Sequence, residues 1–163
     1  MGYICCFTGH RNISVSHANC IIAILDNTLE KLIASGVTVF RMGGALGFDT
    51  LVALKVLEKR NRYPQIALHL CLPCKNQTER WGEYDKKVYD YILNKADSIS
   101  YVTDRYYNGC MLARNRQLVN GSDFCVSYCG KDTGGTAYTV RYAKEHNVKI
   151  INVHTLCEDA LNR

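Results

Sequence analysis

Three short glycine-bearing segments each stand where an apolar, strand-like run gives way to a helix-like one. They are Thr8-Gly9-His10-Arg11, the stretch Gly43 to Asp49, and Gly134-Gly135-Thr136. Glycine has no Cβ, so a ligand can approach its backbone, and the helix that follows directs unpaired N–H groups toward the same point. Three such turns, with arginines beside or between them, predict a cleft for a phosphorylated or nucleotide-like ligand.

Strand-like and helix-like segments alternate along the whole chain. Strands are predicted over 3–8, 37–42, 66–72, 98–102, 124–129 and 148–153, and helices over about 14–35, 48–60, 78–94, 111–119 and 136–146. Such alternation gives parallel strands joined by right-handed crossovers. We therefore predict an α/β fold: a Rossmann-like, doubly wound, mostly parallel sheet of about six strands with helices on both faces, in one domain spanning residues 1–163. Ser14 or Ser16 is expected to cap the first helix, Gly36 to end it, and Pro73 to close the third strand.

The composition argues against membrane and secreted classes. Hydrophobic residues make up 47% of the 163 residues and charged residues 21%, which is typical of a soluble globular protein. The longest apolar runs fall short of the ~20 residues that a membrane span requires. The chain shows no secretory signal, so a cytoplasmic location is expected. The formal charge of +5 is scattered, so it permits nucleic acid as a partner without favouring it.

Cysteine is abundant, but its pattern predicts neither disulfides nor a metal site. The count of nine is odd, and several members lie in strand-like runs where cysteine acts as a small buried hydrophobe: Cys5, Cys6, Cys71, Cys125 and Cys129. Cys71-Leu72-Pro73-Cys74 has the spacing of half a zinc site, yet no second pair of ligands completes it. We expect no metal and no cofactor.

The first glycine turn offers several donors to a ligand. In a doubly wound sheet, ligands bind beyond the carboxyl ends of the strands, so all three turns are expected at one cleft. Gly9 would bring the loop backbone close to the ligand, with Thr8, His10 and Arg11 around it. A guanidinium forms two parallel hydrogen bonds to a phosphate, each worth on the order of 1.5–3 kcal/mol. A surface cation for Arg11 and a structural hydrogen bond for His10 remain alternatives.

The second turn combines backbone donors with an acid. Gly43, Gly44 and Ala45 suit a tight turn with exposed N–H groups, and Gly47 allows close packing beneath it. Asp49 stands at the start of the next helix. It is either an N-cap or an acceptor for a ribose hydroxyl, as in dinucleotide folds. We favour the ligand-binding interpretation.

The third group comes from two segments on either side of the fifth strand. Arg114 and Arg116 lie two apart on a short helix and point about 200° from each other, so one of them can face the cleft. We assign Arg114 and its neighbour Asn115 to the ligand. Gly134, Gly135 and Thr136 would supply N–H groups and a hydroxyl to a phosphate, with an ordinary helix start as the alternative.

Aromatic residues could stack on a base. Tyr128, at the end of the fifth strand, is the preferred stacking residue, because a stacked base gains about 1–3 kcal/mol. Other aromatic residues could overhang the same cleft: Trp81, Tyr84, Tyr106 and Tyr107. Most of the tyrosines are expected to pack structurally.

These residues resemble the SLOG superfamily of Rossmann-like domains, and within it the YpsA-like branch. The matching stretches are Cys6 to Arg11, Gly43 to Asp49, Gln77 with Trp81, Tyr107 to Cys110, Arg114 to Arg116, and Gly134 to Ala137. The resemblance implies a nucleotide or nucleotide-derived ligand over the strand ends. It also implies a homodimer or larger homo-oligomer, because related folds often pair through surface helices.

Three branches of the superfamily imply different functions. SLOG domains of defence systems resemble sensors of ADP-ribose-type or cyclic nucleotide signals, which implies a sensor, a carrier or a sequestering sponge of the kind a phage would use against defence. Met111-x-x-Arg114 is similar to a segment of the Lonely-guy phosphoribohydrolases, but no carboxylate lies near Val140, where N-glycosidase chemistry would need one. Two of the stretches are also similar to DNA-processing protein A, which implies single-stranded DNA binding, although a basic stripe is missing. We rank ligand binding first, hydrolysis second and single-strand binding third, and assign no catalytic residue.

Overall fold

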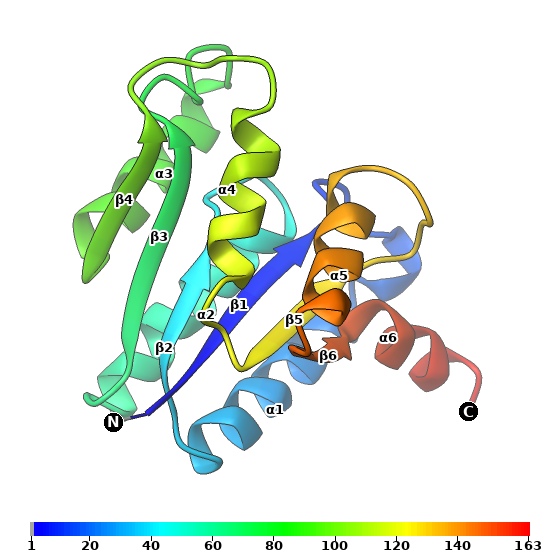
Figure 1. Cartoon of the computed structure of the whole chain (residues 1–163). Helices are drawn as coiled ribbons and strands as arrows, with labels where there is room; N and C mark the ends of the chain where they lie inside the picture. Colours follow the sequence, from blue (N-terminus) through cyan, green and yellow to red (C-terminus); the bar gives the residue numbers. More distant parts are fainter. Residues whose placement is uncertain (1) are drawn as a thin grey trace.

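A parallel sheet of six strands forms the centre of the molecule (Figure 1). The computed structural model describes residues 2–163. The strands are β1 (Tyr3–Gly9), β2 (Val37–Met42), β3 (Ala67–Cys74), β4 (Ser98–Thr103), β5 (Phe124–Tyr128) and β6 (Lys149–Asn152), and their order in the sheet is β4-β3-β2-β1-β5-β6. The helices are η1 (Val15–His17), α1 (Ile21–Ala34), α2 (Phe48–Arg62), α3 (Glu83–Lys95), α4 (Cys110–Val119), α5 (Gly135–Glu145) and α6 (Val153–Leu161). The predicted α/β, Rossmann-like fold is confirmed.

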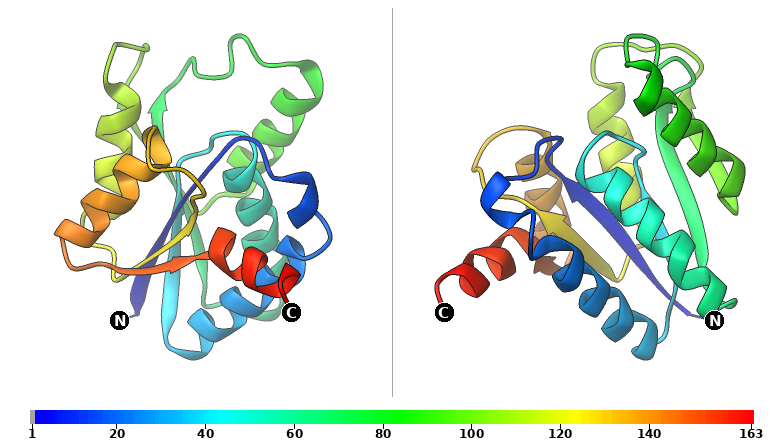
Figure 2. Two further views of the ribbon diagram at one scale, coloured as in Figure 1. Left: turned by 90° about the vertical axis from the view of Figure 1, so that its right-hand side faces the viewer. Right: turned by 180° about the vertical axis from the view of Figure 1, so that it is seen from behind.

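Helices cover both faces of the sheet. α1, α2, α3 and α6 lie on one face, and α4 and α5 lie on the other (Figures 1 and 2). Successive strand residues point to opposite faces, so β1 contributes to both cores. Its Cys5 and Phe7 belong to the larger core, whereas Cys6 packs with Leu118 and Val119 of α4.

The winding of the chain reverses at β1. This strand pairs with β2 on one side and with β5 on the other, where Gly9 lies beside Tyr128. The chain therefore adds strands outward from β1 to β4, then returns to place β5 against the opposite edge of β1. The crevice at such a reversal, outside the carboxyl ends of the strands, is where open α/β sheets bind ligands.

The predicted boundaries of α1, α3 and β3 need correction. α1 begins at Ile21 with Cys20 at its N-cap, while Ser14 precedes the separate short helix η1 without a side-chain cap. α3 begins at Glu83, because turns occupy the preceding residues. β3 continues through Pro73 to Cys74. Pairing with β2 stops at Leu70, so Pro73 lies where β3 has a single neighbour and its missing N–H is tolerated.

Helix α6 was not among the predicted elements. The last strand, predicted over 148–153, ends at Asn152, whose side chain accepts a hydrogen bond from the backbone N–H of His154 and caps a new helix. Val153 and Cys157 are buried, four residues apart on its inner face. An asparagine followed by apolar residues at this spacing predicts a helix start, so the signal was present.

The cysteines are free thiols. Cys5, Cys6 and Cys125 are buried as predicted, whereas Cys71 and Cys129 are partly exposed. As for membranes, none of the helices between residues 2 and 163 has the length and apolar character needed to cross one.

Candidate functional site

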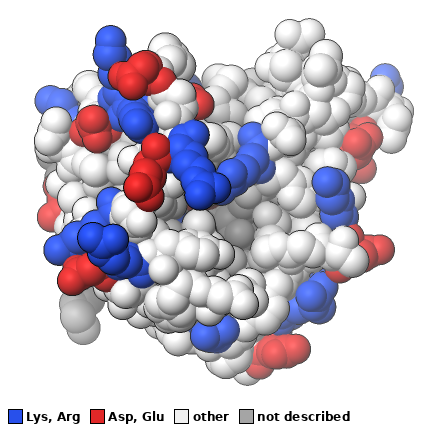
Figure 3. Space-filling model, turned by 90° about the horizontal axis from the view of Figure 1, so that it is seen from above, with Lys and Arg blue, Asp and Glu red and all other residues white. Residues whose placement is uncertain are grey.

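A cleft of about 350 Å³ opens at the carboxyl ends of β1 and β5, between the loops of the two sheet halves. Figure 3 looks onto this edge and shows a hollow near its middle, with lysine and arginine side chains at the rim. Residues of all three glycine turns line the cleft, so the structure brings them together. The predicted residues in its wall are Thr8, Gly9, His10, Arg11, Ala45, Asp49, Arg114, Asn115, Gly135 and Thr136.

The glycines behind this wall are required by packing of the protein on itself. A Cβ at Gly43 would overlap the Arg114 guanidinium, and one at Gly44, where φ is +69°, would meet the side chain of Leu72. Gly47 has a φ of +81°, and a Cβ there would collide with the carbonyl oxygen of Arg11. These contacts let the second loop fold against β3, α4 and the first loop without side chains intervening.

Arg114 is a buried organiser of the cleft. Its side chain is 6% exposed, Nη1 donates to the carbonyl oxygen of Gly43, and Nε donates to Oδ1 of Asn115 at 2.7 Å. Arg116 turns away, and its Nη1 donates to the hydroxyl of Tyr138 on α5 at 3.1 Å. As expected from helical geometry, one of the two arginines faces the cleft. Most of its donors are already used within the protein.

Asp49 lines the cleft, and one of its carboxylate oxygens is buried without a hydrogen-bond partner. The residue is 5% exposed, and Oδ2 accepts a hydrogen bond from the N–H of Ala45 at 3.2 Å. Oδ1 is buried without a partner. Burial raises the pKa of the carboxyl to about 6, although the charge of Arg114 and two backbone N–H groups oppose the shift. Buried acceptors are nearly always bonded, so this oxygen lacks a donor, and a rotation of the carboxyl toward the cleft would let a ligand supply one.

His10 ties the loops of the cleft together. Its Nε2 accepts a hydrogen bond from the N–H of Gly130 at 2.9 Å, which puts the ring proton on Nδ1. Its backbone N–H donates to the carbonyl of Tyr128, and its carbonyl accepts from the N–H of Phe48. Burial, and then the positive charge of Lys131, lower the pKa of His10. The neutral ring is therefore a structural acceptor that retains one donor.

The start of α5 is the better anion site of the cleft. Its N-cap is Gly134, so no side chain caps the first turn, and no acidic residue lies in that turn. The first turn of α2, in contrast, contains Asp49. Free N–H groups and the helix dipole favour an anion at α5. The exposed cations Arg11 and Lys131 line the same cleft.

The prediction that Tyr128 stacks on a base was wrong. Its side chain is 1% exposed and lies against Phe48, with ring centroids 5.7 Å apart and planes 19° from parallel. The hydroxyl accepts the N–H of Ser14 at 3.0 Å and lies 2.7 Å from Nδ1 of His17. Tyr128 points into the core beneath α2, because alternate residues of a strand face opposite sides of the sheet.

A second hollow of about 640 Å³ adjoins the cleft and shares Arg11, Gln77 and Met111 with it. Trp81 and Tyr106 line this hollow, so two of the other aromatic residues lie beside the ligand site. Tyr84 and Tyr107 line neither hollow.

Gln77 and Lys131 also line the cleft, although neither was predicted as a site residue. Gln77 donates to the hydroxyl of Tyr89 at 3.0 Å and to the carbonyl of Gly44 at 3.5 Å. It lies in a turn after β3 that no periodic pattern marks, although it does belong to the stretches that carried the family resemblance. Lys131 lies on the irregular loop after β5, where no periodic pattern marks it either.

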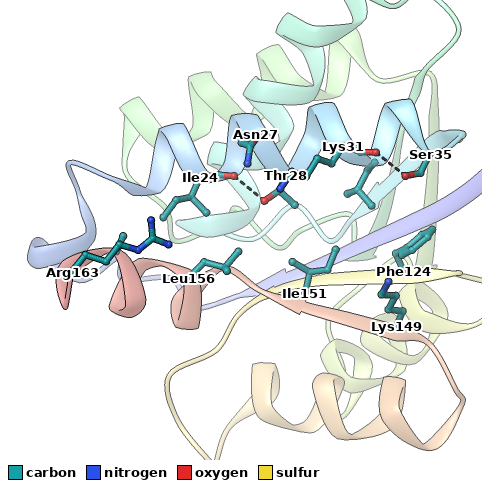
Figure 4. A pocket seen from close by; sticks show the side chains of 12 residues that line it. Ile24, Asn27, Thr28, Lys31, Ser35, Phe124, Lys149, Ile151, Leu156 and Arg163 are labelled. Atoms are coloured by element: carbon teal, nitrogen blue, oxygen red, sulfur yellow. Dashed lines mark hydrogen bonds between the residues drawn. The ribbon is translucent and has the colours of Figure 1, made fainter.

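A separate apolar hollow of about 580 Å³ lies between α1 and α6. Figure 4 shows Ile24 and Lys31 of α1 facing Ile151 and Leu156 across it. Phe124 begins β5 at the same hollow, so this side belongs to the amino ends of the strands. None of the glycine turns reaches it.

A model of the YspA SLOG family (YpsA) matches residues 5–159. A UPF0398 protein of Halalkalibacterium halodurans is 31% identical over 140 residues, which are 80% of this chain and 74% of the relative. A UPF0398 protein of Bacillus pumilus is 30% identical over 129 residues, 77% of this chain and 69% of the relative.

Solved structures are similar in fold. DNA processing protein A from Helicobacter pylori, described with a single-stranded DNA binding mode, aligns with a TM-score of 0.66 at 17% identity over 99% of this chain and 81% of that one. The Streptococcus pneumoniae protein of the same name gives 0.69 at 16% identity, over 99% of this chain and 56% of that one. The structure of TM1055 aligns with a TM-score of 0.56 at 20% identity, over 91% of this chain and 72% of that one. At these identities the likeness concerns the fold.

Proposed function

Because the chain belongs to the YspA SLOG family, we propose that the cleft at the ends of β1 and β5 binds a nucleotide or nucleotide-derived ligand. An ADP-ribose-type or cyclic nucleotide signal is the ligand class that we favour. The protein would hold such a ligand as a sensor, a carrier or a sequestering sponge.

The observation that carries this proposal is that one side of the cleft favours a negatively charged group, whereas the other side needs a hydrogen-bond donor. The start of α5, Arg11 and Lys131 favour a negative charge. The unpartnered Oδ1 of Asp49 needs a hydrogen-bond donor and would repel an anion. A plain phosphate satisfies the first demand only. A sugar phosphate satisfies both, because its phosphate accepts and its hydroxyls donate.

The roles of the residues follow from this polarity. The phosphate would accept hydrogen bonds from the N–H groups of Gly135 and Thr136 and from Arg11. A ribose hydroxyl would donate to Asp49. The base would extend into the adjoining hollow, where Tyr106 and Trp81 offer ring faces.

Ligand-dependent melting tests the proposal. The full chain would be heated with nucleoside monophosphates, cyclic nucleotides, ADP-ribose isomers and inorganic pyrophosphate. A ligand at 100 times its Kd adds about 2.7 kcal/mol to the free energy of unfolding, so a binding nucleotide raises the melting temperature measurably. Ligands that contain ribose should raise the melting temperature more than pyrophosphate does. If no nucleotide changes the melting temperature, the proposal fails.

Arg11→Ala identifies the cleft as the binding place. The variant should weaken the nucleotide by roughly tenfold, the value of one charge-assisted hydrogen bond, without changing the melting temperature of the free protein. Arg62→Ala is the matched control, because Arg62 is an exposed arginine at the far end of α2 that pairs with Glu30. Equal losses in both variants would contradict binding in the cleft.

Mass spectrometry of the recovered ligand separates binding from hydrolysis. Among the residues that line the cleft, Asp49 is the one carboxylate, so an N-glycosidase reaction would have to use it. An intact ligand supports a sensor, carrier or sponge. A released base supports a phosphoribohydrolase-like enzyme.

Single-stranded DNA is the second candidate. The cleft and the adjoining hollow form a groove with the cations Arg11 and Arg80 and the aromatic rings of Trp81 and Tyr106, which are the side chains that bind single strands. A single strand would then bind with an affinity that falls steeply with salt, and Arg80→Ala would reduce that slope. Salt-independent or absent retention of an oligonucleotide excludes this candidate.

A further inference from the structure

Two histidines and a glutamate converge beneath the first loop, on the face of the sheet that α1 and α6 cover. His17 belongs to η1, and His154 and Glu158 belong to α6. Nε2 of His17 lies 3.0 Å from Oε1 of Glu158, and Nε2 of His154 lies 3.9 Å from the same oxygen. One ligand atom from each residue falls within 4.8 Å of the others.

We propose that His17, His154 and Glu158 form a binding site for a divalent transition metal, with Zn²⁺ as the best match. Two imidazoles and one carboxylate are a common three-ligand set for this ion. A tetrahedral ion about 2.0–2.2 Å from each ligand atom separates those atoms by roughly 3.3–3.5 Å. The two separations to Glu158, 3.0 and 3.9 Å, bracket that value. The ligand atoms lie up to 4.8 Å apart, so side-chain rotations that draw the two imidazoles together would admit the ion.

Tyr128 orients the ring of His17. Its hydroxyl lies 2.7 Å from Nδ1 of His17 and also accepts the N–H of Ser14. Histidines that bind metals nearly always have their other ring nitrogen bonded, which fixes the ring and its tautomer. The buried, stacked Tyr128 is therefore the outer partner that such a site needs.

The proton count stays balanced when the ion binds. Without metal, the hydroxyl of Tyr128 donates to Nδ1 of His17, and Nε2–H of His17 donates to Glu158. With metal, the lone pair of Nε2 goes to the ion, so the ring proton sits on Nδ1 and is donated to the phenolic oxygen. That oxygen has two lone pairs and accepts from both Ser14 and His17, while its own O–H turns away from Nδ1.

The site can be reached from solvent. His17 is fully buried, whereas the side chains of His154 and Glu158 are 23% and 50% exposed. An ion can therefore enter beside α6, and its fourth position is left to water. His154 packs directly on Gly130, whose N–H holds His10 of the cleft. The ion would thus join η1 to α6 beside the loop that follows β5.

Cobalt titration tests the site and distinguishes it from the cysteines. The full chain would be treated with a chelator under reducing conditions and then titrated with Co²⁺. We expect one equivalent to bind with weak visible bands of nitrogen and oxygen ligands, without the intense near-ultraviolet band of a cobalt–thiolate bond. Zn²⁺ should displace the Co²⁺ and raise the melting temperature of the protein.

Variants of the exposed ligands then locate the ion. His154→Ala and Glu158→Gln should each weaken Co²⁺ by more than about tenfold, since loss of an outer partner alone costs roughly 10–100-fold in metal affinity. His146→Ala is the matched control, because His146 is an exposed histidine on the opposite face that bonds to the carbonyl of Tyr142. His146→Ala should bind Co²⁺ with the same affinity as the parent protein.

Three results would overturn the proposal. They are failure of the parent protein to bind Co²⁺, a thiolate band that places the ion on cysteines such as Cys20 and Cys157, and unchanged affinity in the His154 and Glu158 variants. Circular dichroism of each variant shows that it is folded. The nucleotide titrations are independent of this outcome.

Discussion

Nη1 of Arg114 donates to the carbonyl oxygen of Gly43, which joins α4 to the loop after β2 across the floor of the cleft. The two residues are 71 positions apart in the chain. Asp49, which lines the same cleft, supplies a negative charge that favours the guanidinium, whereas burial lowers the pKa of Arg114. Arg114 therefore holds the floor of the cleft in place, and a ligand can bind only to those of its N–H groups that are not used within the protein.

Arg114→Ala should destabilise the protein. The Gly43 carbonyl would lose its donor and the buried Asp49 would lose a nearby positive charge, at a cost of about 2–5 kcal/mol in the free energy of unfolding. Urea unfolding measures the loss. Arg116→Ala, which removes a bond to the partly exposed Tyr138, should stay within about 0.5 kcal/mol of the parent protein.

Gly47→Ala should be strongly destabilising. The residue has a φ of +81°, and the new Cβ would collide with the backbone of Arg11. Left-handed backbone costs roughly 1–2 kcal/mol without any clash, so a total above about 2 kcal/mol is expected. Gly82→Ala is the control, because its φ is −68° and nothing lies within 4 Å of the added Cβ. Similar melting temperatures for both variants would contradict the geometry of the loop.

Asp49 should give the protein a distinctive pH dependence. Its pKa is raised by burial to about 6, above the ordinary value of 3.8, so the folded state holds this proton more tightly than the unfolded state does. The resulting stabilisation is fully present below about pH 4 and is lost as the pH rises through 6. A difference of about two pKa units corresponds to roughly 3 kcal/mol as an upper bound.

Comparison with Asp49→Asn isolates this contribution. The stability of the parent protein relative to the variant should fall between pH 4 and pH 7, as measured by urea unfolding at each pH. Asp90 is an exposed carboxyl and provides the control. The curve of stability against pH for Asp90→Asn should run parallel to that of the parent protein. A parallel curve for Asp49→Asn would show that the carboxyl is not buried as described.

Tyr128→Phe and Tyr106→Ala should separate packing from ligand binding. Removing the hydroxyl of Tyr128 leaves the N–H of Ser14 and the ring of His17 without their partner, at a cost of about 1–3 kcal/mol in stability, with little change in nucleotide affinity. Tyr106 is 56% exposed, so its loss should leave stability unchanged and weaken a stacked base by about 1–3 kcal/mol. Calorimetric titration and thermal unfolding together read both effects. The reverse pattern would restore Tyr128 as the stacking residue.

The order of strands and helices was readable in the chain because each carries its own periodicity. Val37–Met42 was predicted with its observed bounds, and Gly36, with a φ of +99°, ends the preceding helix as expected. The convergence of the three glycine turns followed from the rule that parallel strands end at one edge. Each element depends mainly on residues that are neighbours in sequence, so a local pattern can predict it. The order of the elements then predicts the topology of the sheet.

Only the tertiary structure decided which side chains of those segments reach the cleft. Tyr128 and Arg114 both stand at the predicted edge, yet one is turned into the core and the other is held by Gly43. The grouping of His17 with His154 and Glu158 has no trace in sequence spacing, because η1 and α6 meet through the winding of the sheet. Periodicity fixes the face of an element, whereas burial, rotamer and distant partners are set by how all the elements pack together.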